Sequence, residues 1–308
     1  MILCCGEALI DMIPSPTTDG GAGFVPHSGG AVFNSAIALG RLGVQTGMLS
    51  GISSDMFGQQ LMTALKASNV DTSNVVASDR PSTLAFVQLI EGQATYSFFD
   101  ENSAGRMIEL HEIPILPADV SVLFFGGISL ACEPCADAYA ALLEREGGDR
   151  VVMLDPNIRP GFIQDVTRYR TRIEQMIARS DIVKVSDDDL NWMLPGPMSL
   201  PQKAGMLLEK GPSVIILTQG SEGATGFLSN ETAIAVAADK AQIVDTVGAG
   251  DTFNAGVLAK LSALGLLRKT KLKTLPAQVL EQALLNGARA ASIAVSRAGS
   301  NPPWANEL

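Results

Sequence analysis

Residues 245–253 read DTVGAGDTF, and this stretch decides the fold. It predicts the end of a strand, a glycine turn, and a helix that continues to Leu261. Gly248 and Gly250 allow backbone conformations closed to other residues, and the unpaired amides of a helix start attract an anion such as phosphate. At this start we expect Asp251 to be held as a carboxylate by the amides and to accept a proton from a hydroxyl. The simpler alternative is that Asp251 only caps the helix.

Composition restricts the classes of function. The chain has 308 residues, of which 46% are hydrophobic and 18% charged, and a formal net charge of -10. Such a chain can bury a large core, and its acidity argues against a nucleic-acid partner. No apolar run is long enough to span a bilayer, and no basic region precedes the first apolar run. We therefore expect a cytoplasmic protein without a membrane partner.

Cysteine and histidine offer little for metal binding or redox chemistry. Cys132 and Cys135 form a single CxxC, without a second pair, and the chain has only two histidines. A zinc site normally requires four such ligands. Ordinary reduced thiols are the expectation.

The chain alternates between expected strands and helices, most regularly after residue 120. The expected strands are 2–13, 46–51, 120–125, 151–154, 182–185, 214–218, 233–237 and 242–244. The expected helices are 31–42, 55–66, 135–146, 167–178, 200–209 and 277–295. Apolar strands separated by amphipathic helices predict an α/β fold with a mainly parallel central sheet covered by helices on both faces.

One segment departs from this alternation. Residues 84–90 and 94–99 predict a hairpin around Glu91 and Gly92, with no helix between its strands. We expect it to form a small β lid with the region near residues 11–24. The chain is thus predicted to be a single domain, 1–308, with a lid formed by about 11–29 and 81–104.

Polar residues follow several expected strands. They are Asp155–Arg159, Ser186–Asp189 and Gln219–Gly223. Any one cluster is explained by turn chemistry, but parallel sheets bind ligands at the carboxyl ends of their strands, where these clusters converge. Near the front of the chain, Gly29 and Gly30 precede a helix that carries Asn34 in its first turn, and Asp11 lies among apolar strand residues.

These motifs resemble a known family. Gly29, Gly30 and Asn34, together with residues 245–251, are similar to the two signatures of the PfkB family of carbohydrate kinases, which has the ribokinase fold. The resemblance covers nearly the whole chain in the right order, and the second signature is highly specific. Residues 155–159, 184–186 and 98–102 are most similar to those of fructokinases.

The resemblance implies a phosphotransferase that uses ATP and Mg²⁺ to phosphorylate a small sugar. Asp251 would be the catalytic base, and the amides of Gly248, Ala249 and Gly250 would hold the transferred phosphoryl group. The implied sugar ligands are Asp11, Gly29, Gly30, Asn34, Phe99, Arg106, Asn157 and Arg159. The implied nucleotide ligands are Lys184, Ser186, Thr218, Gly220, Ser221, Gly223 and Asn286.

The resemblance also implies cation sites and a lid that closes over the sugar. Many relatives carry Asn and Glu where this chain has Ser186 and Asp189, which leaves the role of Asp189 in organising Mg²⁺ and its waters open. A monovalent cation, K⁺, would lie near Asp245, Arg297 and Gly299. Lid hairpins in this family often pair across a homodimer.

Four functions remain open at the level of the sequence. The first is a fructokinase, and the second is a 2-keto-3-deoxygluconate kinase, whose acid substrate would need a cation such as Arg106 or Arg159. A nucleoside kinase would need aromatic residues to stack a base, for which Phe98 and Phe99 are candidates. A catalytically silent sugar-binding regulator is the fourth, against which the intact Asp251 and its glycines argue.

Overall fold

A nine-stranded sheet forms the centre of the computed structural model, which describes the backbone of residues 1–90 and 93–308 and the side chains of residues 1–87 and 96–308. In spatial order its strands are β15 (Ala233–Val236), β14 (Ala224–Leu228), β13 (Val214–Thr218), β12 (Ile182–Ser186), β11 (Val151–Asp155), β10 (Val122–Gly126), β1 (Ile2–Cys5), β4 (Thr46–Leu49) and β6 (Val70–Asp71). Strands β13 to β6 pair in parallel, and β14 and β15 are antiparallel. The predicted α/β fold with a mainly parallel sheet is confirmed.

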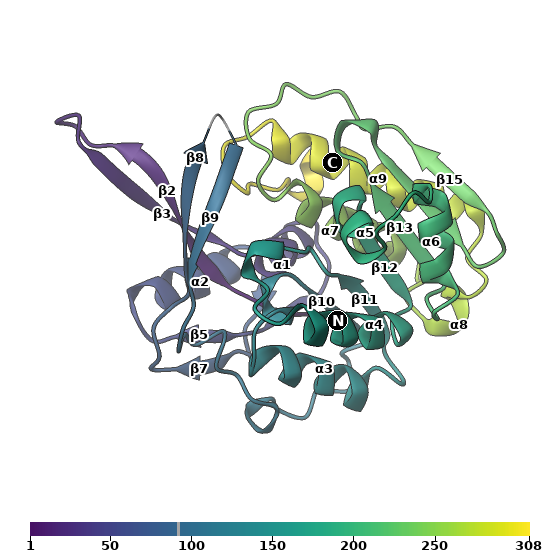
Figure 1. The fold of residues 1–308 in the computed structure, drawn as a ribbon, viewed down its shortest axis with the longest axis horizontal. Helices are drawn as coiled ribbons and strands as arrows, with labels where there is room; N and C mark the ends of the chain where they lie inside the picture. The colour runs from purple at the N-terminus through teal and green to yellow at the C-terminus, as the bar shows by residue number, and fades with distance from the viewer. Residues whose placement is uncertain (91–92) are drawn as a thin grey trace.

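Helices cover both faces of this sheet (Figure 1). One face packs against α1 (Ala31–Arg41), α2 (Met56–Ala67), α7 (Ala249–Ala263), α8 (Lys269–Leu272) and α9 (Ala277–Val295). The other face packs against α3 (Cys135–Glu146), α4 (Val166–Ala178), α5 (Asp187–Met193) and α6 (Leu200–Leu208). Alternate residues of each strand therefore enter separate cores: Phe124 and Met153 belong to the first, and Phe125 and Leu154 to the second. This two-sided burial explains why the strands are almost continuously apolar.

A second sheet of four strands stands against the carboxyl edge of the first. It contains, in spatial order, β3 (Ala22–Gly29), β2 (Leu9–Pro16), β8 (Leu84–Ile90) and β9 (Gln93–Phe99). The β2–β3 hairpin projects from the body of the molecule (Figure 1). The predicted turn at residues 91–92 lies outside the described residues. Strands β5 (Gly51–Ser53) and β7 (Val76–Ser78) form a separate parallel pair.

Two strand predictions are wrong. Residues 2–13 are not one strand but β1 and β2, which belong to different sheets, because the chain turns at Gly6, where a Cβ would lie 2.5 Å from the Val32 side chain. Residues 242–244 form no strand. Ile243 is 65% exposed, and the Val244 amide donates to the Val295 carbonyl at the end of α9 instead of to a neighbouring strand.

Several elements were not predicted, strand β14 and helix α5 among them. Strand β14 follows a glycine-rich turn, and Gly226 within it admits the Leu280 side chain of α9, which a Cβ would approach to 2.7 Å. Helix α5 begins at Ser186, whose hydroxyl accepts from the Asp189 amide, so the polar cluster after β12 is a helix start.

Candidate active site

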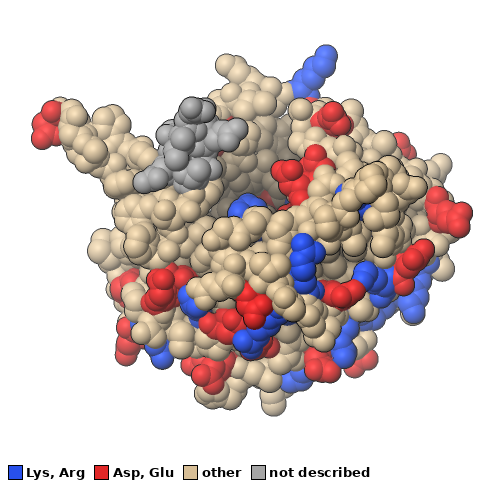
Figure 2. Space-filling model, in the orientation of Figure 1, with Lys and Arg blue, Asp and Glu red and all other residues tan. Residues whose placement is uncertain are grey.

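A cavity of about 830 Å³ lies between the carboxyl edge of the central sheet and the inner face of the four-stranded sheet β3-β2-β8-β9, which corresponds to the predicted lid and is called the lid below. Figure 2 shows the molecule hollowed beside the lid, with acidic and basic side chains in the hollow. A second cavity of about 470 Å³ adjoins the first, and the two share Thr218, Ile243, Thr246, Ala249 and Gly250. The cleft therefore has two lobes that meet at the glycine turn.

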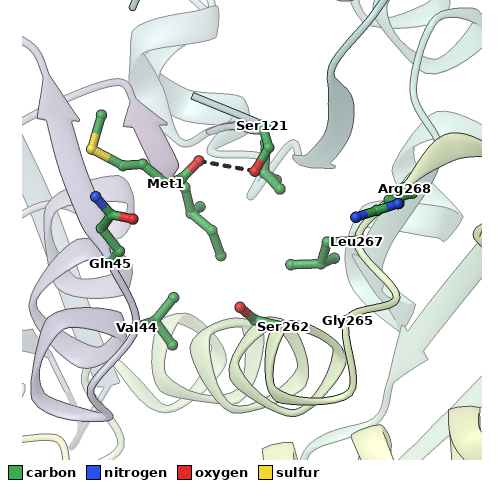
Figure 3. A pocket seen from close by; sticks show the side chains of 10 residues that line it. Met1, Val44, Gln45, Ser121, Ser262, Gly265, Leu267 and Arg268 are labelled. Carbon is green, nitrogen blue, oxygen red and sulfur yellow. Dashed lines mark hydrogen bonds between the residues drawn. The ribbon is translucent and has the colours of Figure 1, made fainter. Parts of the chain in front are cut away.

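A further cavity, about 230 Å³, lies at the opposite, amino-terminal edge of the sheet. The starts of β1 and β10 and the end of α7 line it, and Ser121 Oγ donates to the Met1 carbonyl at 3.4 Å (Figure 3). None of the described residues that line this cavity carries a carboxylate. The predicted catalytic and binding residues are all absent from its lining.

The glycine turn is shaped by Gly248, which begins α7 in the left-handed conformation with φ 76°. A Cβ on Gly248 would lie 2.2 Å from Ser300 Oγ, so this position requires glycine for both reasons. The following residues, Ala249, Gly250 and Asp251, form the first turn of α7 and line the larger lobe. Amides at such a helix start have no intrahelical acceptor, so the turn is suited to an anion.

Asp251 is buried, and its carboxylate is held from α1. Its Oδ2 accepts from Asn34 Nδ2 at 2.9 Å, and its backbone carbonyl accepts from Ser35 Oγ at 3.2 Å. Burial raises the pKa of Asp251 to about 7, with smaller increases from Asp155 and Glu7. We expected the helix amides to hold this carboxylate, and the structure shows the Asn34 side chain as its hydrogen-bond donor instead. A carboxyl that titrates near neutrality is suited to act as a general base.

A buried polar cluster lies beneath the turn. Asp155 Oδ2 accepts from Lys184 Nζ at 3.1 Å and from Asn254 Nδ2 at 2.6 Å. Burial lowers the pKa of Lys184, but Asp155 and Asp189 raise it by more, so its ammonium stays charged at the wall of the larger lobe. Asn254 was not predicted as a site residue. The sequence did offer a signal for it, because Asn254 is a polar residue between the apolar residues Phe253 and Ala255 of an expected helix.

The larger lobe brings together most of the residues predicted to bind the sugar. Asp11, Gly30, Asn34, Asn157 and Arg159 line it. Asn157 has φ 45°, a conformation that non-glycine residues seldom adopt and that is frequent at functional sites. Burial, and then Glu7, raises the pKa of Asp11 to about 6.

Gly29 acts indirectly, because it is not part of the lining. A Cβ at Gly29 would lie 2.0 Å from Asp11 Oδ2, so the missing side chain leaves space for that carboxylate.

Two residues predicted to bind the sugar point elsewhere. Phe99 is 56% exposed on the outer face of the lid, where it packs against Phe86, because successive side chains of a strand face opposite sides. Tyr96 and Phe98 line the lobe in its place. Arg106 is not part of the lining: its guanidinium donates to Asp100 Oδ1 at 3.0 Å and to the Glu133 carbonyl at 3.2 Å.

The smaller lobe contains three residues from the turn after β13 that were predicted to bind the nucleotide, namely Gly220, Ser221 and Gly223, together with Thr218. Lys184 and Ser186 line the larger lobe instead. Asn286 lines neither lobe, because its side chain donates to the Gly256 carbonyl at 2.8 Å and joins α9 to α7. The apolar wall comes from Phe253, Ala288, Ala291 and Val295, which the sequence did not indicate.

The residues predicted to surround cations are largely engaged with the backbone. Asp189 accepts from the amides of Ile158 at 2.8 Å and Ser186 at 3.1 Å. Asp245 accepts from the amides of Val247 at 3.0 Å and Gly299 at 2.9 Å. Within the part of the chain that the structure describes, no cluster of three His, Cys, Asp or Glu residues could hold a metal ion.

The guanidinium of Arg297 is engaged by the carboxyl-terminal segment. Its guanidinium forms an ion pair with Glu307 Oε1 at 2.6 Å. The structure therefore unites Asp245 with Gly299 and places the side chain of Arg297 on the carboxyl-terminal segment.

Glu7 is another site residue that sequence reasoning missed. It lines the larger lobe, is 7% exposed, and accepts from the Ala31 amide at 2.9 Å and the Ser129 amide at 3.3 Å. It falls within the first predicted strand, and only the turn between β1 and β2 brings it to the site.

Comparison with known proteins identifies the family. The model of the pfkB family carbohydrate kinases matches residues 1–307. The chain belongs to this family. It is 52% identical over 288 residues to the fructokinase of Rhizobium leguminosarum bv. trifolii, which covers 93% of this chain and 86% of that protein. The fructokinase of Klebsiella pneumoniae is 30% identical over 266 residues, 85% of this chain and 84% of that protein.

Solved structures show the same fold for this sugar kinase. The crystal structure of fructokinase with bound ATP from Xylella fastidiosa matches with a TM-score of 0.88 and 24% identity, over 97% of this chain and 93% of that one. The predicted ribokinase-like α/β fold is thus confirmed. In the described part of this kinase, no helix has the length and apolar character of a transmembrane span.

Proposed function

We propose that this sugar kinase is a fructokinase that transfers the γ-phosphate of ATP to a hydroxyl of fructose. The observation that carries the proposal is the position of Asp251, a buried carboxyl with a pKa of about 7 that lines the larger lobe directly after the glycine turn at which the two lobes meet. A sugar in the larger lobe and a nucleotide in the smaller lobe would have their reacting atoms on either side of the glycine turn. The 52% identity to a fructokinase supports fructose as the sugar.

The chemistry follows from the residues at this junction. Asp251 takes the proton of the attacking hydroxyl, and the amides of Gly248, Ala249 and Gly250 bind the oxygens of the transferred phosphoryl group. Lys184, charged and 3.5 Å from the position of a Cβ on Gly250, adds positive charge beneath the turn. Asp11, Asn34 and Arg159 orient the sugar. Phosphoryl transfer depends mainly on such alignment and charge neutralisation.

Mg²⁺ and K⁺ belong to the proposal as expected cofactors. Both oxygens of Asp189 already accept from backbone amides, so this carboxylate is fitted to hold waters of a magnesium ion rather than to bind it directly. Bound to ATP, Mg²⁺ would neutralise phosphate charge. Asp245 and the Gly299 segment remain the proposed place for K⁺.

The lid is proposed to close over the sugar and to join two copies of the chain. Tyr96 and Phe98 cover the larger lobe, and Phe98 packs against Phe162 of the main body with ring centroids 4.8 Å apart. Closure would exclude water and limit hydrolysis of ATP. On the outer face Phe24 and Phe99 are exposed, which supports a homodimer through the lid. All four cysteines are free thiols, which fits a cytoplasmic location.

The test is ATP consumption by the purified protein with Mg²⁺ across fructose, 2-keto-3-deoxygluconate, ribose, adenosine and a control without sugar. We expect strong turnover with fructose alone. Preference for the keto acid would give Arg159 the role of carboxylate ligand, and preference for adenosine would give Tyr96 and Phe98 the role of base-stacking residues. Either result would overturn fructose as the substrate and retain the kinase mechanism.

A further inference from the structure

Glu7 occupies the turn between β1 and β2, at a point where three elements meet. Its Oε1 accepts from the amide of Ala31, the first residue of α1, and its Oε2 accepts from the amide of Ser129 in the turn after β10. Its own carbonyl accepts from the Phe33 amide at 3.3 Å. One side chain thus ties the start of α1 to the carboxyl end of a central strand.

The surrounding chain leaves space for this carboxylate. A Cβ at Gly127 would lie 2.0 Å from Glu7 Oε1, and a Cβ at Gly30 would lie 3.1 Å from Glu7 Cγ. Both glycines have positive φ, 72° and 107°. Burying a carboxylate is costly unless hydrogen bonds compensate. Two glycines that leave room for the Glu7 side chain, and two amides that donate to it, therefore form a specific binding pocket for this carboxylate.

Helix α1 connects the Glu7 carboxylate to the proposed catalytic base, Asp251. Asn34 lies one turn after Ala31 and donates to Asp251 Oδ2, and Ser35 donates to the Asp251 carbonyl. Any shift of the α1 start would therefore move both groups that hold Asp251. Glu7 lines the same lobe as Asp11 and Asp251, and its charge raises the pKa of both carboxyls.

We propose that Glu7 is a positioning residue for phosphoryl transfer: its carboxylate fixes the start of α1 and so holds Asn34 against Asp251. This proposal rests on the proposed kinase function of the cleft. It also makes Glu7 one of the negatively charged groups whose electrostatic field acts on Asp251.

Several titratable or charged groups contribute to this field, and each of them affects how the activity depends on pH. Glu7 raises the pKa of Asp11 from β2 and of Asp251 from α7, and Cys135 and Tyr139 face it from α3. Asp155 and Lys184 act on Asp251 from β11 and β12. Burial raises the pKa of Glu7 itself by more than the hydrogen bonds from the Ser129 and Ala31 amides lower it. Glu7→Gln removes the negative charge of its ionised form and keeps the shape of the side chain.

The first measurement compares Glu7→Gln with the wild type, using whichever sugar of the panel the wild type phosphorylates. The glutamine amide can accept from only one of the two backbone amides, so we expect kcat to fall roughly 10- to 100-fold, the size of effect that misplaced catalytic groups produce. We also expect the acid limb of kcat/KM to move to lower pH, because a negative neighbour of Asp251 is lost. Failure of the wild type on fructose would count against the substrate alone.

Asp181→Asn is the matched control. Asp181 is also buried and accepts from a backbone amide, that of Val152 at 2.8 Å, and from Lys269 Nζ, but it precedes β12 at the amino edge of the sheet. We expect it to lower the unfolding temperature while kcat and the pH profile of the folded enzyme stay unchanged. Glu7→Gln with wild-type kcat, or with kcat reduced and an unmoved acid limb, would overturn the proposal.

Glu7→Asp covers the case in which the glutamine variant does not fold. The shorter side chain keeps the charge but does not reach both amides. We expect lower kcat with the acid limb at the wild-type pH. Unchanged kcat in this variant would contradict the positioning role.

Discussion

Asp251 is the residue on which the proposed phosphoryl transfer depends most directly. We expect Asp251→Asn to lower kcat by roughly 10²- to 10⁴-fold, the usual contribution of a general base. Sugar binding, measured by calorimetry without nucleotide, should persist, because Asp11 and Arg159 remain in the lobe. A variant with normal turnover would show that another group removes the proton.

The protonation of Asp251 sets a dependence on pH. Burial raises its pKa to about 7, so the carboxylate that accepts a proton is lost as pH falls through this value. We expect kcat/KM of the wild type to be constant above about pH 8 and to fall tenfold per pH unit well below 7, as the base becomes protonated. A rate profile with an acid limb near pH 4 would contradict the raised pKa.

The same raised pKa has a consequence for stability. Between the unfolded value of 3.8 and about 7, the folded state binds a proton that the unfolded chain releases, so the stabilisation present at low pH is lost as pH rises through 7. Asp251→Asn removes this charged form. Without ligands, we expect the variant to unfold at least about 2 °C higher than the wild type at pH 8, and the difference to shrink toward pH 5.

Among the elements, α7 carries the proposed anion-binding turn at its start and an ordinary turn at its end. Gly248 and Gly265 both have left-handed backbones, with φ 76° and 66°. A Cβ meets Ser300 at Gly248 and no atom within 4 Å at Gly265. A side chain at Gly265 would cause backbone strain alone, whereas a side chain at Gly248 would cause backbone strain and a steric clash. Substitutions at the two positions therefore distinguish the two effects.

We expect Gly265→Ala to cost roughly 1–2 kcal/mol of unfolding free energy, the strain of a left-handed residue, and to leave kcat unchanged. Gly248→Ala should cost more and should also lower kcat, because relief of the clash displaces the amides of the turn. Denaturant unfolding and steady-state kinetics measure the two effects. Equal kcat in both variants would exclude a role for the shape of the turn.

Strand β9 presents neighbouring aromatic residues to opposite faces of the lid. Phe98 lines the larger lobe, and Phe99 lies outside. We expect Phe98→Ala to raise KM for the sugar and to increase ATP hydrolysis without sugar, because the lid then excludes water less well. Phe99→Ala is the control, with both quantities expected at wild-type values in the assay. The opposite pattern would restore Phe99 to the sugar site, as first predicted.

At the scale of the whole molecule, the outer face of the lid is available for assembly. Phe24, Phe86 and Phe99 form a row of edge-to-face contacts across its strands, with centroids 5.0 and 5.4 Å apart. We expect sedimentation to show a dimer for the wild type and a monomer for Phe24→Glu, since a buried charge opposes association. A monomeric wild type at micromolar concentration would contradict the proposed homodimer.

Much of the fold was predictable because periodicity reports local burial. Helices 135–146 and 277–295 were predicted with the observed bounds. Both ends of six strands of the central sheet were predicted to within two residues, namely β4, β10, β11, β12, β13 and β15. Strand β14 and the break at Gly6 were not predicted, because Gly226 and Gly6 are needed to make room for side chains that are distant in the sequence, Leu280 and Val32. Local sequence does not contain those contacts.

By itself, the sequence determined the family, the glycine turn and Asp251, since a short run of residues builds this turn through its own backbone preferences. Tertiary structure decided how the site works. It raised the pKa of Asp251 by burial, assigned Asn34 to hold it, turned Phe98 inward and Phe99 outward, and brought Glu7 from an expected strand interior to the cavity wall. These properties depend on which surfaces exclude water and which residues meet across the chain, and those quantities exist only once the fold has formed.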